Sequence, residues 1–410
     1  MYNRRQFIVG SLAAGSAAAL GCGGAPPPDA TTAPPPPPPP SPAPSAAPTS
    51  EPAATGPAKK TLLILGGTRL IGPHVVEAAK ARGYTVTLFN RGKTRPELFP
   101  DLEKLHGDRD PTKGEGLKAL AGRKWDAVID NSGYVPRIVR ASAELLAPNV
   151  GQYIFVSSIS AYADNSVVGA DESAPVATMA DPTVEEMGKE FENYGPLKAL
   201  CEQAAEKAMP GRVANVRPGY IVGPEDGTDR FTYWPVRVAR GGEMLVPGTP
   251  NDPIQIIDVR DLADFLMTLV DNRTMGVFNA VGPGEPLTMG GVLDTCKAAT
   301  GANPTFTWVS GQFLKERPEP IELPIWELPE GKTKGFHTWS SAKARKAGLK
   351  HRPVAETVKD TLTWFRALPE DRQKKIRAGL PPEKEAELLA EWKKLQKGQG
   401  KKPAPKKKAG

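Results

Sequence analysis

Short apolar runs alternate with amphipathic stretches from about residue 61 to residue 365. Runs bounded by glycine or polar residues, as in buried parallel strands, lie at 61–65, 85–90, 103–107, 126–130, 153–157 and 277–281. Helical patterns lie at 74–82, 114–120, 138–146, 258–270, 341–349 and 354–365. Strands and helices that alternate at this spacing predict an α/β fold built on a doubly wound parallel sheet.

The pattern becomes irregular after Pro224. We expect a small C-terminal lobe, formed mainly by residues 224–260 and 283–350. Its tryptophans could line a pocket, but aromatic residues in a small lobe are more often core, and we favour the core for Trp308, Trp326 and Trp339. No motif in this lobe identifies a substrate.

The first sixty residues are typical of an export signal followed by a spacer. Arg4-Arg5 precedes Phe7 and a short run of small and apolar residues, so residues 1–24 resemble a bacterial Tat signal. Cys22 lies where lipoproteins are acylated, although Ala19 replaces the usual leucine; cleavage without lipidation and an uncleaved anchor stay open. Residues 25–60 are rich in proline and alanine and predict a disordered tether. We therefore expect an exported protein, periplasmic or anchored to the membrane by a lipid.

The net charge of +7 belongs to the end of the chain. Between Lys393 and Gly410 there are eight lysines and no acidic residue, which leaves about −1 for everything else. We expect residues 366–410 to be helical at first and then a solvated, lysine-rich tail; weak contact with an anionic surface is the alternative. Because the folded part is not basic, we expect no nucleic-acid partner. The three cysteines cannot form a disulfide framework, and no cluster has metal-ligand spacing.

A glycine-rich turn joins the first predicted strand to the first helix. Gly66-Gly67-Thr68-Arg69-Leu70-Ile71-Gly72 lies between them. Glycines let the backbone turn tightly and approach a pyrophosphate at the positive end of the helix. Strand, turn and helix in this order predict a Rossmann-type dinucleotide site.

The end of the second strand bears on which dinucleotide binds. NAD sites usually carry an acidic residue here, whereas this chain has Asn90-Arg91, with Lys93 and Arg95 close behind. A neutral residue followed by arginine suits a 2′-phosphate, so the sequence favours NADP, with NAD left open. A solvated loop charge is the alternative reading of Arg91.

Tyr194 and Lys198 stand four residues apart, which places them on one face of a helix. A lysine cation beside a tyrosine favours the phenolate and pulls its pKa toward neutrality. Tyr194 is then a general base toward a hydroxyl group, or a general acid in the reverse direction. Ser158, at the end of the fifth strand, could hydrogen-bond the same substrate oxygen.

These motifs, in this order, resemble the extended short-chain dehydrogenase/reductase family, the NAD(P)-dependent epimerases, dehydratases and reductases. The resemblance covers Gly66 to Gly72, Gly107-Asp108, Ser157-Ser158, Tyr194-Gly195-Pro196-Leu197-Lys198 and Arg217-Pro218-Gly219. It implies hydride transfer with Ser158, Tyr194 and Lys198 as catalytic residues. It also implies that Lys198 holds the nicotinamide ribose, that Asp108 contacts the adenine and that the small C-terminal lobe, residues 224–260 and 283–350, is a substrate lobe. The expected cofactor-binding residues are Gly66, Thr68, Arg69, Ile71, Gly72, Asn90, Arg91, Asp108, Lys198 and Pro218.

Two departures from the family pattern limit what the resemblance implies. Arg69 replaces the middle glycine of the turn, as in an atypical branch of the family. Its large side chain hinders close approach of the turn backbone to the pyrophosphate, but its guanidinium could contact a phosphate. Ile159 and Ser160 replace the acidic pair of the sugar dehydratases, which argues against that subclass.

A tethered Rossmann module without turnover is the competing hypothesis. Asp258 and Asp261 are interpreted as a capping pair for the helix that follows rather than as substrate contacts.

Overall fold

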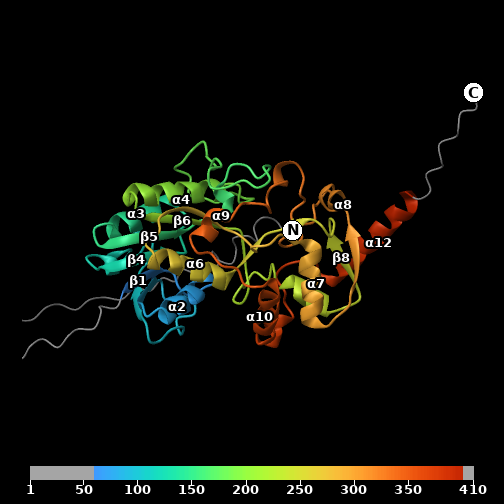
Figure 1. The fold of residues 1–410 in the computed structure, drawn as a ribbon, viewed down its shortest axis with the longest axis horizontal. Helices are drawn as coiled ribbons and strands as arrows, with labels where there is room; N and C mark the ends of the chain where they lie inside the picture. The colour runs from blue at the N-terminus through green and yellow to red at the C-terminus, as the bar shows by residue number, and fades with distance from the viewer. Residues whose placement is uncertain (1–59, 400–410) are drawn as a thin grey trace, which may run out of the picture.

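A seven-stranded parallel sheet forms one half of the protein (Figure 1). The computed structural model describes residues 60–399; the expected export signal, Cys22, nearly all of the expected tether and the end of the lysine-rich tail lie outside this range. The strands lie side by side in the order β11-β6-β5-β4-β1-β2-β3. Their bounds are β1 Thr61–Leu65, β2 Thr85–Asn90, β3 Glu103–His106, β4 Trp125–Asp130, β5 Val150–Val156, β6 Val213–Pro218 and β11 Gly276–Ala280. The doubly wound sheet predicted from the sequence is confirmed.

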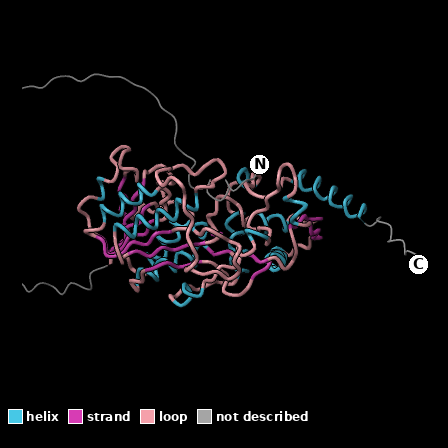
Figure 2. The backbone as a smooth tube through the Cα atoms, turned by 90° about the horizontal axis from the view of Figure 1, so that it is seen from above, coloured by secondary structure: helices cyan, strands magenta, loops and turns pink. Residues whose placement is uncertain are grey.

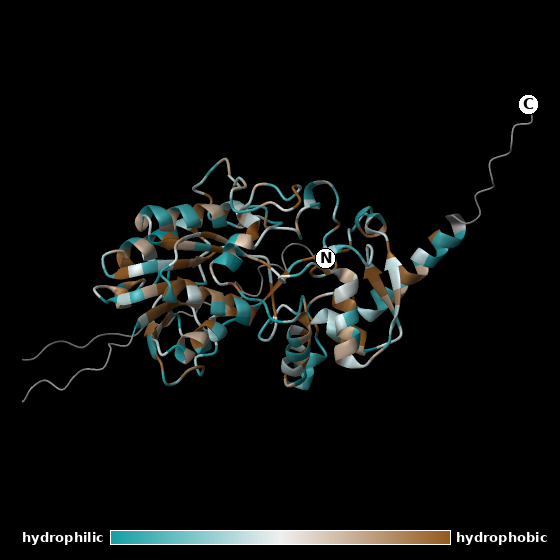
Figure 3. Cartoon of the chain, viewed as in Figure 1, coloured by the Kyte–Doolittle hydropathy of each residue, from teal (hydrophilic) through white to brown (hydrophobic). Residues whose placement is uncertain are grey.

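Helices cover both faces of this sheet because its strands are apolar on both faces. Leu62 and Ile64 point to the face covered by α2 (Ile71–Ala81) and α6 (Val259–Asp271). Leu63 and Leu65 point to the other face, covered by α3 (Pro136–Leu146) and α4 (Tyr194–Ala208). The hydropathy colours of Figure 3 show the apolar strands between the mixed surfaces of these helices.

The second lobe has its own core and mostly short elements (Figure 2). Its strand pairs are β7–β10, β8–β13 and β9–β12. The strand bounds are β7 Tyr220–Val222, β8 Glu243–Pro247, β9 Pro253–Ile254, β10 Ile256–Asp258, β12 Leu287–Thr288 and β13 Thr305–Val309. The helices of this lobe are α5 Tyr233–Ala239, α7 Met289–Thr300, α8 Gly311–Lys315, α10 Val354–Arg366, α11 Glu370–Gln373 and α12 Pro382–Gln399. The short helix α9 (Ala342–Lys346) packs instead on the sheet lobe, whose core includes Ala344. Trp326 and Trp339 are buried and Trp308 packs against the lobe core, as favoured from the sequence.

The packed structure continues past residue 365, where the alternating pattern of the sequence ends. Glu385, at the start of α12, is almost fully buried and binds Arg237 of α5 through two contacts of 2.8 and 2.9 Å. Leu388 and Leu389 are part of the second-lobe core. Only the far end of α12 extends away from the lobe (Figure 1).

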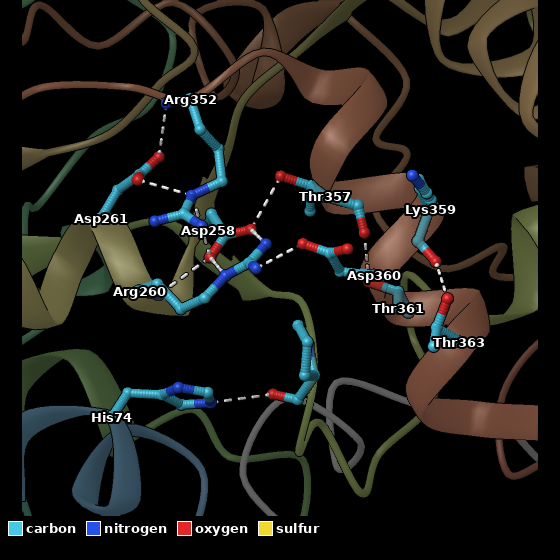
Figure 4. Close-up of polar contacts among 11 residues, drawn as sticks. His74, Asp258, Arg260, Asp261, Arg352, Thr357, Lys359, Asp360, Thr361 and Thr363 are labelled. Atoms are coloured by element: carbon cyan, nitrogen blue, oxygen red, sulfur yellow. Dashed lines mark hydrogen bonds and ion pairs between the residues drawn. The ribbon is translucent and has the colours of Figure 1, made fainter. Parts of the chain in front are cut away.

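Two local predictions have opposite outcomes. The helix predicted at 114–120 is wrong: only Lys118–Leu120 forms a single 3-10 turn, because Gly114 and Gly116 adopt positive φ angles of 54° and 52°. The capping role of Asp258 is confirmed, since its carboxylate accepts from the Arg260 backbone N–H at the start of α6 at 2.9 Å. Figure 4 shows that the same carboxylate also binds the Arg260 side chain and the hydroxyl of Thr357 on α10.

Candidate active site

One cavity of about 630 Å³ follows the carboxyl ends of the sheet strands. This is where open parallel sheets bind their ligands. Of the predicted site residues in the described range, those lining the cavity are Gly66, Thr68, Arg69, Ile71, Asn90, Arg91, Asp108, Ser158, Tyr194, Lys198 and Pro218. Gly72 lies directly behind the turn. The structure therefore brings the separate motifs together in a single site.

The glycine turn has the backbone shape that the sequence motif requires. Gly66 and Gly67 have φ angles of +119° and +96°, a region that side chains disfavour. A Cβ on Gly72 would lie 2.5 Å from the backbone carbon of Gly67, so the helix can pack against the turn only with glycine at this position. Arg69 is exposed at the cavity, and its side chain does not fill the turn.

Asn90 braces the turn from the end of β2. Its amide donates to the Gly66 carbonyl oxygen at 3.1 Å and its oxygen accepts from the Gly92 N–H at 2.8 Å. Arg91 is exposed and lines the cavity beside it. Arg95 also lines the cavity, but its guanidinium pairs with Glu225. Arg91 and Lys93 are thus the cations at this strand end that a 2′-phosphate could meet.

A buried ion pair lies next to Asp108 in the cavity wall. Asp108 accepts from the Asp110 N–H at 3.0 Å and so shapes the loop after β3. The next residue, Arg109, binds the Asp130 carboxylate through contacts of 2.5 and 2.8 Å. The hydroxyl of Tyr153 donates to the same carboxylate at 2.8 Å. This network fixes the loop after β3 and the end of β4 relative to the middle of β5.

Two buried polar groups test whether a dinucleotide fits here. The Asn131 side-chain nitrogen and the Ser157 hydroxyl have no hydrogen-bond partner within the described range, and both residues line the cavity. Leaving such groups unpaired costs free energy, so a ligand that bonds them is favoured. With the open glycine turn, these residues fit a dinucleotide.

Ser158 and Tyr194 meet in the same cavity. Ser158 is almost fully buried, and its Oγ accepts from the Ser160 N–H at 3.1 Å. Burial raises the pKa of Tyr194 above its ordinary value, while a hydrogen bond with Ser158 acts in the opposite direction. Tyr194 therefore holds its proton more firmly than the sequence analysis expected.

The Lys198 side chain is buried and connects two backbone segments by hydrogen bonds. Its Nζ donates to the carbonyl oxygens of Gly133 and Val156, each at 2.7 Å. Burial lowers the pKa of Lys198 to about 8. An ammonium carries three N–H donors, so one donor remains beyond these two bonds for a ligand hydroxyl.

Sequence reasoning missed the cation that acts on Tyr194. Arg230 is buried, lines the cavity and favours the Tyr194 phenolate, opposing the rise in the pKa of Tyr194. Its Nε donates to the Thr228 hydroxyl at 2.9 Å. Trp364 and Arg377 also line this end of the cavity, although they follow the predicted substrate-lobe segments in the chain. The charged run Glu225 to Arg230 after a strand was a usable signal for Arg230; nothing local marked Trp364 or Arg377.

The fold and the site define a Rossmann-type nicotinamide-dinucleotide protein. Residues 62–281 match the NAD dependent epimerase/dehydratase family. The chain belongs to this family, whose cofactor is NAD.

Two curated relatives illustrate its range. The chain is 26% identical over 320 residues to the chloroplast stem-loop binding protein of 41 kDa b of Arabidopsis thaliana, covering 73% of this chain and 77% of the relative. It is 27% identical over 247 residues to the epimerase family protein SDR39U1 of Bos taurus, covering 55% of this chain and 76% of the relative.

Solved structures share the fold at low sequence identity. A UDP-N-acetylglucosamine 4-epimerase from Bacillus cereus superposes with a TM-score of 0.54 at 17% identity, over 75% of this chain and 99% of that one. A UDP-glucuronic acid 4-epimerase from the same organism, in complex with NAD, gives 0.55 at 13% identity, over 75% and 98%.

Residues 60–399 include no group of side chains suited to hold a metal ion. The same stretch has no helix with the length and apolar character of a membrane span.

Proposed function

We propose that the protein is an NAD(P)-dependent epimerase- or reductase-like enzyme that acts on a hydroxyl or carbonyl group of a sugar-like or other polar substrate. The observation that carries this proposal is the meeting of Ser158, Tyr194 and Lys198 in the cavity that begins at the glycine turn. The alternative is an exported Rossmann-fold binding module without turnover.

Proton transfer would take place at the Tyr194 hydroxyl. With its pKa above the ordinary value, Tyr194 is protonated at neutral pH and is suited to donate a proton to a carbonyl oxygen as it gains negative charge. Ser158 would donate a hydrogen bond to the same oxygen. In the reverse direction, Arg230 would stabilise the phenolate that accepts the proton from a hydroxyl group.

Cofactor positioning would depend on the turn and on Lys198. The third N–H of Lys198 would hold a ribose hydroxyl, and the unpaired Asn131 nitrogen would donate to the ligand near Gly66. The nicotinamide, when bound, supplies or accepts the hydride.

Within this proposal the cofactor preference is NADP. Arg91 and Lys93 support it because both are exposed beside Asn90 at the end of β2. Replacing Arg91 with alanine should weaken NADPH more than NADH in a direct binding titration. Equal losses for the two dinucleotides would argue for NAD.

Export is a further part of the proposal, resting on residues 1–24 and Cys22. An exported enzyme meets no sustained pool of reduced cofactor, so a bound dinucleotide would have to be regenerated in place. An epimerase-like cycle that oxidises and then reduces one substrate meets this requirement. Native mass spectrometry of protein released from its source membrane would report acylation of Cys22 and any retained dinucleotide. Periplasmic protein that carries and binds no dinucleotide would refute this cycle.

Tyr194→Phe is the decisive substitution for turnover. Removal of one hydroxyl should lower turnover by about 10²- to 10⁴-fold while NADH binding is retained. Sugars and nucleotide sugars are supplied as substrates, and the assay measures both the reduced nicotinamide and the formation of the epimeric product, because an epimerase returns its cofactor to the starting state. Tyr84→Phe is the matched control, because the Tyr84 hydroxyl bonds Asp271 and its residue does not line the cavity. A binding module would show bound NADH and no turnover with either protein.

The expectation of no nucleic-acid partner stays a prediction. The name of the Arabidopsis relative makes an RNA stem-loop the appropriate probe. The full chain and a variant ending at Lys393 should both fail to retain it at physiological salt. Binding by both proteins would overturn the expectation.

A further inference from the structure

The loop after β7 contacts the loop after β2. Glu225 lies in the first loop and Arg95 in the second. The two Arg95 nitrogens Nη1 and Nη2 donate to the two carboxylate oxygens of Glu225 at 2.5 and 3.3 Å. Paired contacts of this kind restrain both distance and orientation.

This pair spans the middle of the sheet. β7 directly follows β6, and β1, β4 and β5 lie between β6 and β2. The ends of those three strands carry the glycine turn, Asn131 and Ser158, all of which line the same cavity as Arg95 and Glu225. A ligand lying along these strand ends is therefore bridged by the pair.

The loop is held on both sides of Glu225. His74, at the start of α2 and labelled in Figure 4, donates from Nε2 to the Pro224 carbonyl oxygen at 3.2 Å. On the other side, the fully buried Asp229 accepts from Arg372 at 2.6 Å and from the Arg377 N–H at 2.8 Å. The segment between Pro224 and Asp229, which contains Glu225, is therefore held at both of its ends.

The backbone at the pair adopts shapes that are uncommon outside glycine. Arg95 has a φ of 46° and Glu225 a φ of 73°. Such conformations persist where surrounding contacts impose them, and they concentrate at functional sites. Both residues of the ion pair thus have a positive φ angle.

We propose that Arg95 and Glu225 form a clasp that retains the dinucleotide in its cavity. They are positioning residues: they slow the release of the cofactor and take no part in hydride or proton transfer. The inference rests on the proposed function only in placing a dinucleotide in this cavity.

The test measures the dissociation rate of NADH from the full-length protein, displaced by excess NAD⁺ in a stopped-flow fluorimeter. Arg95→Gln should release NADH about fivefold faster, as expected for the loss of a partly exposed ion pair. Arg123→Gln is the matched control: Arg123 and Arg95 side chains are 38% and 37% exposed, and Arg123 binds Glu103 at 2.6 and 2.8 Å away from the cavity. The control should leave the rate unchanged.

Glu225→Gln separates a clasp from a direct phosphate contact. A clasp predicts faster release from this variant too, with both NADH and NADPH. If Arg95 instead bound the 2′-phosphate, freeing it from Glu225 would slow NADPH release. The doubly exchanged variant, Arg95→Glu with Glu225→Arg, should recover much of the wild-type rate.

A second readout needs no cofactor. Amide hydrogen exchange of residues 225–228 should be faster in Arg95→Gln than in Arg123→Gln, with equal thermal unfolding midpoints. Unchanged NADH release and unchanged exchange in Arg95→Gln would overturn the clasp while leaving the proposed function standing. A wild-type protein that binds neither NADH nor NADPH would overturn both.

Discussion

The two lobes of this protein differ in how far apart in the sequence the residues lie that hold each lobe together. In the sheet lobe, the strands other than the edge strand β3 are mostly apolar and buried by their neighbours, and the elements alternate regularly. In the second lobe, Arg237 of α5 is neutralised by Glu385, 148 residues later. The first lobe can therefore be recognised from local pattern, whereas the second is defined by pairings that no local pattern specifies.

Removing Glu385 should have the largest effect on stability. Its carboxylate accepts from Arg237, from Arg240 at 2.6 Å and from the Leu245 N–H at 3.0 Å. Glu385→Ala leaves a buried arginine without its counter-charge, which costs about 3 to 5 kcal/mol. Urea unfolding measures the loss. Glu387→Ala, on the same helix but exposed, should change stability little; equal effects would show that the second lobe does not depend on this pairing.

The corresponding weak point of the sheet lobe is Gly72. Gly72→Ala pushes the turn away from α2, because the added Cβ would meet the Gly67 backbone. We expect NADH binding to weaken by about a hundredfold, the usual scale for a displacement near 1 Å. Gly291→Ala in α7 is the control, since its Cβ meets only ordinary contacts at 3.4 and 3.5 Å. Unchanged affinity in a fluorescence titration would mean that the turn does not hold the cofactor.

Acid should weaken the second lobe through His337. Burial lowers the pKa of His337 to about 3 from 6.5, so the folded state binds fewer protons than the unfolded chain. The stabilisation is complete above the unfolded value of 6.5 and declines as the pH falls toward 3, by about 2 kcal/mol near pH 5. Urea unfolding of His337→Gln should show a shallower pH dependence than wild type. The exposed His106→Gln should match the wild-type slope, and a wild-type slope in both variants would contradict this role.

The smallest expected effect concerns Arg230, which comes from the second lobe but acts on the sheet lobe. Arg230→Met removes a cation that favours the Tyr194 phenolate, so the pKa of Tyr194 should rise further. Turnover in the oxidation direction should fall by at most about tenfold, and its pH profile should move to higher pH. Arg230→Lys keeps the charge and should restore the profile. A profile unchanged in Arg230→Met would assign Arg230 a packing role only.

The sequence predicted the site residues of the sheet lobe, but not those that the rest of the chain brings to the cavity. Tyr194 and Lys198 were recognisable because a helix fixes their spacing, and Gly66 and Gly72 because a turn of this shape tolerates little else. Arg230, Trp364 and Arg377 were not, since long-range packing brings them to the cavity. The mistaken helix at 114–120 has a local cause, two glycines with positive φ. The pKa of Tyr194 was misjudged because burial, which sequence spacing does not report, outweighs the nearby charge.

The position of Glu385 near the end of the chain has a consequence for biosynthesis. A ribosome makes the glycine turn and the Tyr194 helix long before it makes Arg377 or Glu385. Trp364 and Arg377, which complete the lining of the cavity, are therefore synthesised only after all the other residues that line it.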